Sequence, residues 1–224
     1  MKTIMIVVHH LNNSRSQRVL WLLEELGVPY EVKRYERDAK TMLAPPELRA
    51  VHPLGKSPVI TDGDKTIAET GAIVEYLVGT YGGGRLVPRE GTEERRRYTY
   101  WLHFAEGSAM PPLVMTLLFT EIPKRMPALL RPIGKMIGGT VIGSFLKPNI
   151  DAQLSLINAE LTRSAWFAGD EFTAADVMMS FPLEAAVSRG GLGDNLKVSD
   201  FVARIHARPA YQAALQRGGK YAYA

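Results

Sequence analysis

Apolar residues alternate between strand-like and helix-like spacing over the first third of the chain. The compact β-branched run at 3–8 predicts a buried strand. Apolar positions at helical spacing follow over 19–26, and Gly27 is placed to cap that helix at its C-terminus. The charged residues of this helix, Arg18 among them, are expected to face solvent. Residues 30–35 predict a second strand, at an edge of the sheet because its polar positions are charged.

A hairpin and a further helix complete this pattern. Residues 38–54 carry three prolines and predict a loop with at most one short helix. Residues 58–61 and 65–68, joined by an Asp-Gly-Asp turn, predict two antiparallel strands. A helix with one apolar face then runs over 70–81 and ends at three consecutive glycines. This order of elements predicts a four-stranded mixed sheet with helices packed on it.

The pattern changes after Pro88. From Thr92 onward only helical periodicity is left, interrupted by prolines, and no strand is predicted. The glycines and prolines of residues 84–91 indicate a linker. We therefore expect an α/β domain at 1–83 and an all-helical domain at 92–224.

Composition narrows the classes of function. The formal net charge is +4, but the densest basic cluster, at 95–97, follows two glutamates in a helical pattern. That arrangement predicts a solvated helix face rather than a nucleic-acid contact. The chain has no cysteine, which excludes disulfides, thiolate metal sites and catalysis by its own thiol, and fits a reducing compartment. The most apolar internal stretch, 133–146, is shorter than the roughly 20 residues that span a bilayer, so no transmembrane segment is expected.

Three short motifs in the first 70 residues could each contact one small peptide. Pro58, after Ser57, predicts a cis-proline bend that leaves the Ser57 backbone open to an extended peptide. Alternatively, Pro58 could do no more than begin an edge strand. Glu69 and Thr70 lie where a strand meets a helix N-terminus, which favours a bound carboxylate. Thr70 could also serve only as an N-cap. Ser14 stands just before the first helix, as a hydrogen-bond donor or as another N-cap.

These motifs, in this order and spacing, resemble the glutathione transferases, and the resemblance extends over essentially the whole chain. It is strongest for a serine-type group shared by fungi and bacteria. The segments that carry it are Ser14 to Leu26, Ala44-Pro-Pro-Glu-Leu, His52-Pro-Leu-Gly-Lys-Ser-Pro, Glu106-Gly-Ser with Pro111-Pro-Leu, and Phe172 to Leu183. The resemblance implies a thioredoxin-like N-terminal domain, an all-helical C-terminal domain, and a cytoplasmic homodimer.

The resemblance also implies how glutathione, the co-substrate, is bound. The bend at Ser57 and Pro58 would pair with the cysteinyl backbone. Glu69 would bind the γ-glutamyl ammonium, and Thr70 the neighbouring carboxylate. Lys56 would bind the glycine carboxylate, although it could also be an ordinary surface lysine. His52 is a second candidate for that contact.

Ser14 would carry the chemistry. A thiol with a pKa of about 8.5 is ionised by only a few per cent at pH 7. A hydrogen bond from the Ser14 hydroxyl to sulfur, aided by the helix N-terminus, would lower that pKa, and the neighbours Asn13 and Arg15 could assist. No metal is implied, because His9 and His10, adjacent in a strand, would point to opposite faces.

The second substrate is expected to be a small hydrophobic electrophile bound by the helical half. The pocket residues implied are His103, Glu106, Gly107 and Met110. Looser candidates on the same or the next helix are Tyr100, Phe104, Pro111, Met115 and Phe119. The expected reaction is conjugation of glutathione. The same site could instead support peroxidase, isomerase or dehalogenase chemistry, or the protein could bind glutathione and hydrophobic ligands without catalysis.

Three further segments have separate predictions. The Gly- and Ile-rich stretch 133–146 could form a dimer contact, a cleft wall or a membrane-surface contact. Residues 220–224 could be a disordered tail or a flap over the cleft. Thr173-Ala-Ala-Asp176 predicts a capping box at the start of a core helix, with a role in stability rather than catalysis.

Overall fold

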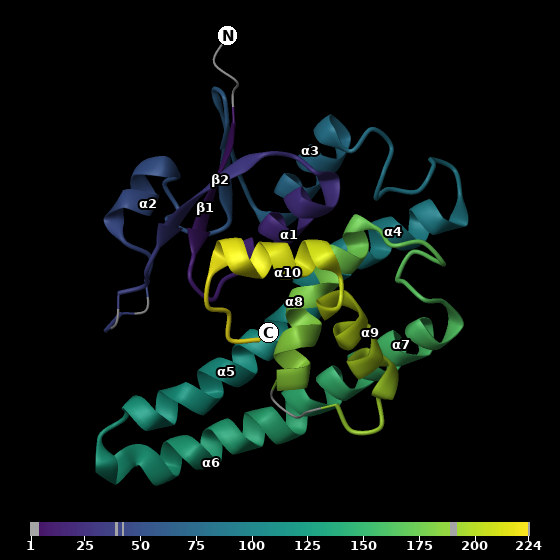
Figure 1. Ribbon diagram of the computed structural model, residues 1–224. Coiled ribbons are helices and arrows are strands. Elements are labelled where there is room, and N and C mark those ends of the chain that lie inside the picture. Colours follow the sequence, from purple (N-terminus) through teal and green to yellow (C-terminus); the bar gives the residue numbers. More distant parts are fainter. Residues whose placement is uncertain (1–4, 39, 42, 189–191, 224) are drawn as a thin grey trace.

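The computed structural model describes residues 5–38, 40–41, 43–188 and 192–223, which form a sheet-containing part and a helical part (Figure 1). The first part consists of β1 (Ile6–Leu11), α1 (Ser16–Leu26), β2 (Tyr30–Tyr35), α2 (Pro46–Val51), β3 (Val59–Asp62), β4 (Lys65–Ala68) and α3 (Thr70–Tyr81). The second part consists of α4 (Glu93–Phe104), α5 (Met110–Arg125), α6 (Arg131–Val141), α7 (Lys147–Arg163), α8 (Ala174–Ser188), α9 (Leu196–His206) and α10 (Pro209–Gly218). Short segments of π or 3₁₀ geometry at Ala105–Ala109, Ala128–Leu130 and Ile142–Leu146 join α4, α5, α6 and α7 in turn.

The four strands form one mixed sheet in the order β2-β1-β3-β4, as predicted. β1 is parallel to β2 and antiparallel to β3, and β3 and β4 form the predicted hairpin. β2 lies at an edge of the sheet, also as predicted. β1 differs from its prediction at both ends: residues 1–4 lie outside the described part, and the strand continues past Val8 to Leu11. It continues because His9 and His10 are buried beside polar partners, Tyr35 and Ser16.

Helix α1 ends where predicted, at Gly27, whose φ of 67° is a left-handed conformation that glycine adopts readily. The helix contacts β1 and α3 of the first part and α8 and α10 of the second. The prediction that Arg18 faces solvent is wrong, since only 1% of its surface is exposed. A carbonyl of α8 and the carboxylate of Glu106 cover that side of the helix and take its hydrogen bonds.

The last helix, α10, packs closely on α1. A Cβ added at Gly218 would come within 2.5 Å of a side chain of α1. The ring centroids of Trp21 and Tyr211 lie 5.3 Å apart, edge to face. The Nε of Arg208 donates to a carboxylate oxygen of Glu25 over 2.6 Å. The two parts of the chain consequently share one continuous hydrophobic core.

Among the described residues after Tyr81 there is no strand, as predicted. Helix α8 begins with the predicted capping box, in which Asp176 Oδ2 accepts from the N–H of Thr173 at 2.8 Å and from its hydroxyl at 3.0 Å. Burial raises the pKa of Asp176 to about 6. The linker expected at 84–91 falls between α3 and α4. The domain limits themselves, 1–83 and 92–224, stay a prediction.

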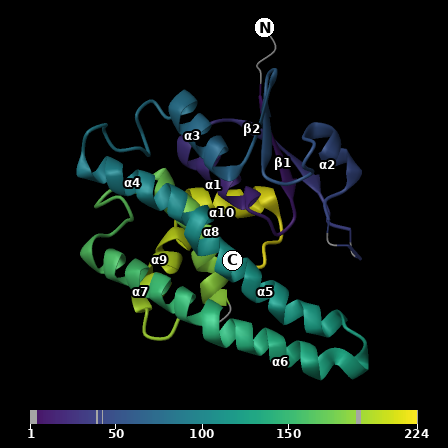
Figure 2. The same cartoon turned by 180° about the vertical axis from the view of Figure 1, so that it is seen from behind.

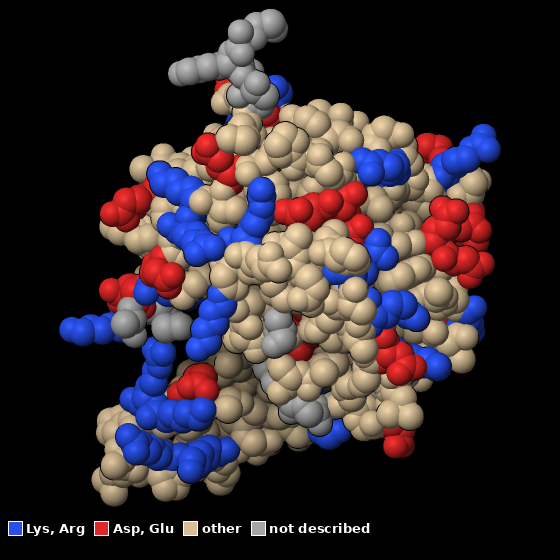
Figure 3. Space-filling model, viewed as in Figure 1, with Lys and Arg blue, Asp and Glu red and all other residues tan. Residues whose placement is uncertain are grey.

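Helices α5 and α6 extend from the rest of the molecule as a long hairpin (Figures 1 and 2). They approach closely, since a Cβ at Gly138 would lie 2.7 Å from the carbonyl oxygen of Phe119. Basic side chains gather at the tip of the hairpin (Figure 3), and the exposed ones are Lys124, Arg125, Arg131 and Lys135. Exposed apolar residues of the hairpin include Leu117, Leu118, Ile122, Leu129, Ile133, Met136, Ile137 and Phe145. No helix in the described ranges is long and apolar enough to cross a membrane.

Candidate active site

One cavity of about 120 Å³ brings most of the expected glutathione-binding residues together. Its walls come from the start of α1, the loop between α2 and β3, the junction of β4 with α3, and the π-helical segment after α4. The lining residues are Arg15, His52, Leu54, Lys56, Ser57, Pro58, Ala68, Glu69, Thr70 and Glu106. Segments far apart in sequence therefore converge on one small polar cavity.

Ser57 is tied to the sheet through its side chain. The Ser57–Pro58 peptide bond is cis, as predicted. The hydroxyl of Ser57 donates to the carbonyl of His9 over 2.9 Å and accepts from the N–H of Leu11 over 3.2 Å. The backbone N–H and C=O of Ser57 form no hydrogen bond with any residue in the described ranges. They are free to pair with an extended peptide, which is a one-residue case of strand addition.

Glu69 and Thr70 join β4 to α3 in a conformation that exposes polar groups to the cavity. Glu69 has a φ of 71°, which is rare for a residue other than glycine and occurs often at functional sites. Its carboxylate is exposed, whereas Thr70 is buried at the first position of α3. An exposed carboxylate beside a helix N-terminus can bind an ammonium and a carboxylate at once. That combination suits the zwitterionic end of an amino acid.

A buried arginine supports this corner of the cavity and was missed by the sequence analysis. Arg18 donates from Nη1 to the carbonyl of Met178 at 2.8 Å and from Nη2 to the hydroxyl of Thr70 at 3.4 Å. It also forms a very short ion pair with Glu106, and Arg15 Nε lies 3.2 Å from the same carboxylate oxygen. Burial lowers the pKa of Arg18, and Glu106 opposes that shift.

The sequence does contain a signal for this burial. Arg18 precedes Leu22 by four residues and Leu26 by eight, so it lies on the apolar stripe of α1. A charged residue on such a stripe needs a partner from elsewhere in the fold. Glu106, which the analysis assigned to the electrophile pocket, is that partner.

Ser14 lies behind the cavity rather than in its lining, and only 5% of its surface is exposed. Its Oγ is 2.6 Å from the Oγ of Ser16 and 3.4 Å from the Oγ of Ser57. Ser16 Oγ is in turn 2.9 Å from His10 Nδ1. Burial, with a smaller contribution from Arg34, lowers the pKa of His10 to about 4, so this imidazole is neutral at pH 7. Ser14 thus ends a buried hydrogen-bonded chain beside Ser57.

The four residues expected to bind the electrophile do not share one place. Glu106 lines the polar cavity described above. His103 and Gly107 are exposed and do not line that cavity. Met110 is buried in a small cluster with Leu113, Phe181 and Tyr221. The sequence analysis missed Phe181 and Tyr221, which lie 71 and 111 positions further along the chain.

The residues after α10 are packed onto the protein as far as Tyr223. The N–H of Ala222 donates to Asn13 Oδ1 over 2.9 Å, next to Ser14 in the chain. The Tyr221 hydroxyl donates to Glu184 of α8 over 2.6 Å. Of the two alternatives for this tail, the contacts favour the flap, since it covers Met110 and reaches the residue beside Ser14.

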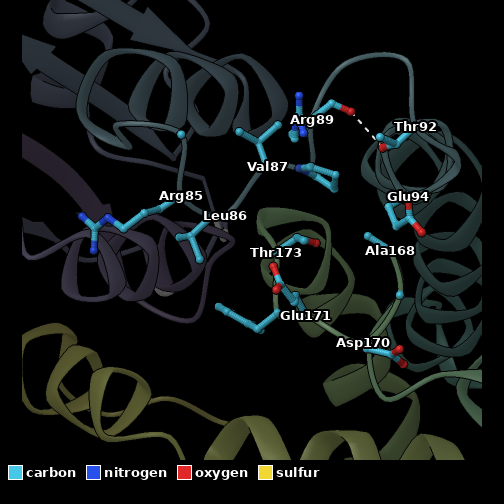
Figure 4. A pocket seen from close by; sticks show the side chains of 14 residues that line it. Arg85, Leu86, Val87, Arg89, Thr92, Glu94, Ala168, Asp170, Glu171 and Thr173 are labelled. Carbon is cyan, nitrogen blue, oxygen red and sulfur yellow. Dashed lines mark hydrogen bonds between the residues drawn. The ribbon is translucent and has the colours of Figure 1, made fainter.

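A second cavity, of about 720 Å³, lies along the linker and includes none of the expected site residues (Figure 4). Its charged residues do not converge: Arg85 points away from it, to the carbonyls of Gly82 and Leu26. Thr92 Oγ1 donates to the carbonyl of Arg89 over 2.8 Å (dashed in Figure 4). Arg85 and Thr92 thus hold the linker and the adjoining turn in place.

The adjacent histidines of β1 face different neighbours. His9 Nδ1 is 2.9 Å from the hydroxyl of Tyr35, and His10 Nδ1 is bonded to Ser16. The prediction that the two side chains diverge is confirmed. Within the described ranges, no group of three or more His, Cys, Asp or Glu residues could hold a metal ion.

The two-part architecture is the one found in glutathione transferases. Family models for the N-terminal and C-terminal domains of glutathione S-transferase match residues 4–79 and 144–209. Glutathione S-transferase 3 of Schizosaccharomyces pombe is 40% identical over 183 residues, which cover 81% of this chain and 74% of the relative. The chain belongs to the glutathione S-transferase family.

Further relatives agree over nearly the full length. Glutathione S-transferase 1 of Saccharomyces cerevisiae is 29% identical over 222 residues, covering 95% of this chain and 94% of the relative. A solved glutathione S-transferase of Actinobacillus pleuropneumoniae has a TM-score of 0.80 and 31% identity, covering 98% of this chain and 95% of its own. A glutathione transferase of Phanerochaete chrysosporium, solved with oxidized glutathione, shares the fold with a TM-score of 0.74 and 19% identity, covering 96% and 95%. Members of this family bind glutathione as a co-substrate; the serine-type assignment of this chain stays a prediction.

Proposed function

We propose that this chain is a glutathione transferase that conjugates the glutathione thiolate to small hydrophobic electrophiles. The convergence of Lys56, Ser57, Glu69 and Thr70 on one polar cavity carries the proposal. Together these residues complement all three parts of the tripeptide, and the family membership supports transferase activity. Glutathione is the co-substrate, and the cytoplasm, which holds the glutathione pool, is the proposed compartment.

In the proposed complex the cavity fixes the tripeptide at three points. The free backbone groups of Ser57 pair with the cysteinyl residue, beside Pro58. Glu69 and the N-terminus of α3, with the hydroxyl of Thr70, bind the γ-glutamyl end. Lys56 binds the glycine carboxylate. Holding the peptide this way places its sulfur near the start of α1, and much of the rate enhancement comes from that placement.

Ser14 is the proposed catalytic residue. Its Oγ lies 3.4 Å from the Ser57 side chain, so sulfur of a peptide paired with Ser57 comes close to it. The hydroxyl of Ser14 turns from its acceptor in the protein to donate to the thiolate, and the thiol proton passes to solvent. The thiolate then attacks the electrophilic carbon, forming a C–S bond, while the leaving group or a conjugated π system takes the displaced electron pair.

Replacing Ser14 tests this assignment. In Ser14→Ala the pKa of bound glutathione should rise by about one to two units, because the thiolate loses its donor, and kcat at neutral pH should fall about 10- to 100-fold. Ultraviolet absorbance of the thiolate against pH and turnover of an aryl halide measure the two effects. Ser155→Ala, an exposed serine of α7, is the matched control.

The outcomes separate enzyme from binding protein. If Ser14→Ala leaves both the thiol pKa and the turnover unchanged, Ser14 is not catalytic. If the wild type is retained on immobilised glutathione yet shows neither a lowered thiol pKa nor turnover of aryl halides, epoxides, enones or hydroperoxides, a non-catalytic binding protein is favoured.

We also propose that the enzyme is a homodimer in which the α5–α6 hairpin contributes to the interface. The support is its cluster of exposed apolar residues, Ile133 and Ile137 among them. Sedimentation equilibrium should give twice the 24.8 kDa of one chain. The double variant Ile133→Asp, Ile137→Asp should shift the mass toward that of one chain. A wild-type protein that sediments as a monomer would refute this part of the proposal.

A further inference from the structure

The tail after α10 packs on Phe181, an aromatic residue near Arg15 of the glutathione cavity. Arg15 lines that cavity, and its guanidinium carbon lies 5.7 Å from the ring centroid of Phe181. The ring of Tyr223 stands edge-on to Phe181, with centroids 5.6 Å apart at 88°. A continuous path of contacts therefore runs from the cavity through Arg15 and Phe181 to the last described residue of the tail.

Two independent bonds hold this tail segment. The backbone N–H of Ala222 donates to Asn13 Oδ1 over 2.9 Å, which ties the tail to the loop that precedes α1. The hydroxyl of Tyr221 donates to the buried carboxylate of Glu184 over 2.6 Å. Tyr223 lies just beyond both anchors.

The carboxylate of Glu184 is well suited to be a permanent anchor. It is 2% exposed and accepts hydrogen bonds from Tyr221 and Tyr211, each over 2.6 Å, with His206 Nε2 at 3.1 Å. A buried carboxylate that lost one of these donors would be poorly compensated, so the tail stays closed at this point.

Tyr223 is the member of this aromatic group with surface left to contact a ligand. Phe181 and Tyr221 are each 8% exposed, whereas Tyr223 is only half-buried. Both of its ring neighbours meet it edge-on, with Tyr221 at 5.5 Å and 89°. These contacts hold the Tyr223 ring in one orientation, so it can offer a flat, ordered surface to a planar partner.

We propose that Tyr223 is a specificity-determining residue of the second-substrate site and selects electrophiles that carry an aromatic ring. The inference rests on the proposed glutathione transferase function, since the electrophile must lie beside the glutathione sulfur. In the proposed complex an aromatic ring attached to that sulfur extends beyond the cavity to Tyr223, whereas a methyl group is too short to reach it.

Binding of two stable glutathione derivatives tests this without relying on turnover. Isothermal titration calorimetry compares S-benzylglutathione with S-methylglutathione. The wild type should bind the benzyl derivative about three- to tenfold more tightly, the size expected of one ordered aromatic contact. Tyr223→Ala should reduce that ratio to near one, and Tyr223→Phe, which keeps the ring, should retain it.

Tyr221→Phe is a second test of the same proposal. Loss of its hydroxyl releases the tail from Glu184, so the benzyl-to-methyl ratio should fall although every ring is still present. A thermal unfolding curve for each variant shows that it is folded before its ratio is compared.

The possible failures are distinguishable. If the wild type binds neither derivative, the proposed function itself fails. If the wild type binds both derivatives and Tyr223→Ala has the same benzyl-to-methyl ratio as the wild type, glutathione binding stands and the role of Tyr223 is overturned. A wild type with no preference between the two overturns it as well.

Discussion

The cavity along the linker and the cavity proposed for glutathione differ in more than their volume. The linker cavity is about six times larger than the glutathione cavity, at about 720 Å³ against about 120 Å³. In the linker cavity, polar groups such as Arg85 and Thr92 are bonded to the protein's own backbone. In the glutathione cavity, the backbone of Ser57 and the carboxylate of Glu69 are left open. The convergence of these open groups, rather than volume, supports the proposal that the smaller cavity is the ligand site.

The largest expected effect concerns the fold beside the linker cavity. The pKa of Asp176 is about 6 in the folded protein and about 3.9 when unfolded, so the folded state binds more protons between these values. The contribution of this group to the free energy of unfolding therefore falls by about 3 kcal/mol in total as pH rises, with most of the fall between pH 4 and 6. His10, whose pKa is lowered to about 4, gives a rise over the same range, so the Asp176 contribution is the difference between the wild type and Asp176→Asn in urea unfolding. That difference should shrink as pH rises.

Two checks accompany this prediction. Asp64→Asn, at an almost fully exposed carboxylate, should keep the wild-type pH dependence. Glutathione affinity at pH 7 should be the same in Asp176→Asn as in the wild type, since Asp176 bonds Thr173 of the linker cavity and no residue of the glutathione cavity. An altered glutathione affinity would show that the linker cavity and the glutathione cavity are not independent.

A smaller loss of stability is expected at Glu106, whose carboxylate is bonded to the buried Arg18. Glu106→Gln leaves that guanidinium without its countercharge. Because the Glu106 side chain is 33% exposed, the cost should be about 2 kcal/mol, below the range of fully buried pairs. Urea unfolding at pH 7 measures it. Glu121→Gln, which breaks an exposed pair with Lys124, should cost less than about 0.5 kcal/mol; equal losses would mean that burial does not matter here.

Glutathione binding itself should change most at Glu69. Glu69→Gln removes the negative charge that pairs with the γ-glutamyl ammonium, so the Kd for glutathione should rise about tenfold. Calorimetry measures the Kd directly. The free energy of unfolding should stay within about 0.5 kcal/mol of the wild type, because the carboxylate is exposed. A variant with unchanged Kd would contradict the proposed γ-glutamyl contact.

The smallest effect should come from the linker cavity. Glu171→Gln removes an exposed carboxylate from its wall without touching the glutathione cavity. The Kd for glutathione should change less than about twofold and stability by less than about 0.5 kcal/mol. A loss of affinity comparable to that of Glu69→Gln would show that the larger cavity takes part in binding after all.

Local features of the fold could be predicted from the sequence because their causes are local. The cap at Gly27, the hairpin at Asp62-Gly63-Asp64 and the capping box at Asp176 depend on residues within a few positions. The edge strand β2 was found in full from its own six residues. The same holds for the cis-proline bend at Ser57 and Pro58, which its neighbours in the chain define.

What could not be predicted depends on remote partners. Arg18 looked exposed because Glu106 and α8 lie far along the chain. Met110 looked like a pocket residue because its cover, Tyr221, is supplied by the tail. The bonding of Ser14 to Ser16 and His10 depends on how β1 meets α1, which no spacing rule describes. His103 and Gly107, given only by the resemblance, stay predictions for the electrophile site.

The close seating of α10 on α1 has a consequence for how the chain holds together. The first helix of the sheet-containing part, α1, is covered by the last helix of the helical part, α10. The contacts are the close approach of Gly218, the ring pair of Trp21 and Tyr211, and the bond between Arg208 and Glu25. Neither part can detach without uncovering the core of the other. A protease nick in the linker should therefore leave two fragments that remain associated, and heating should melt both in a single cooperative transition.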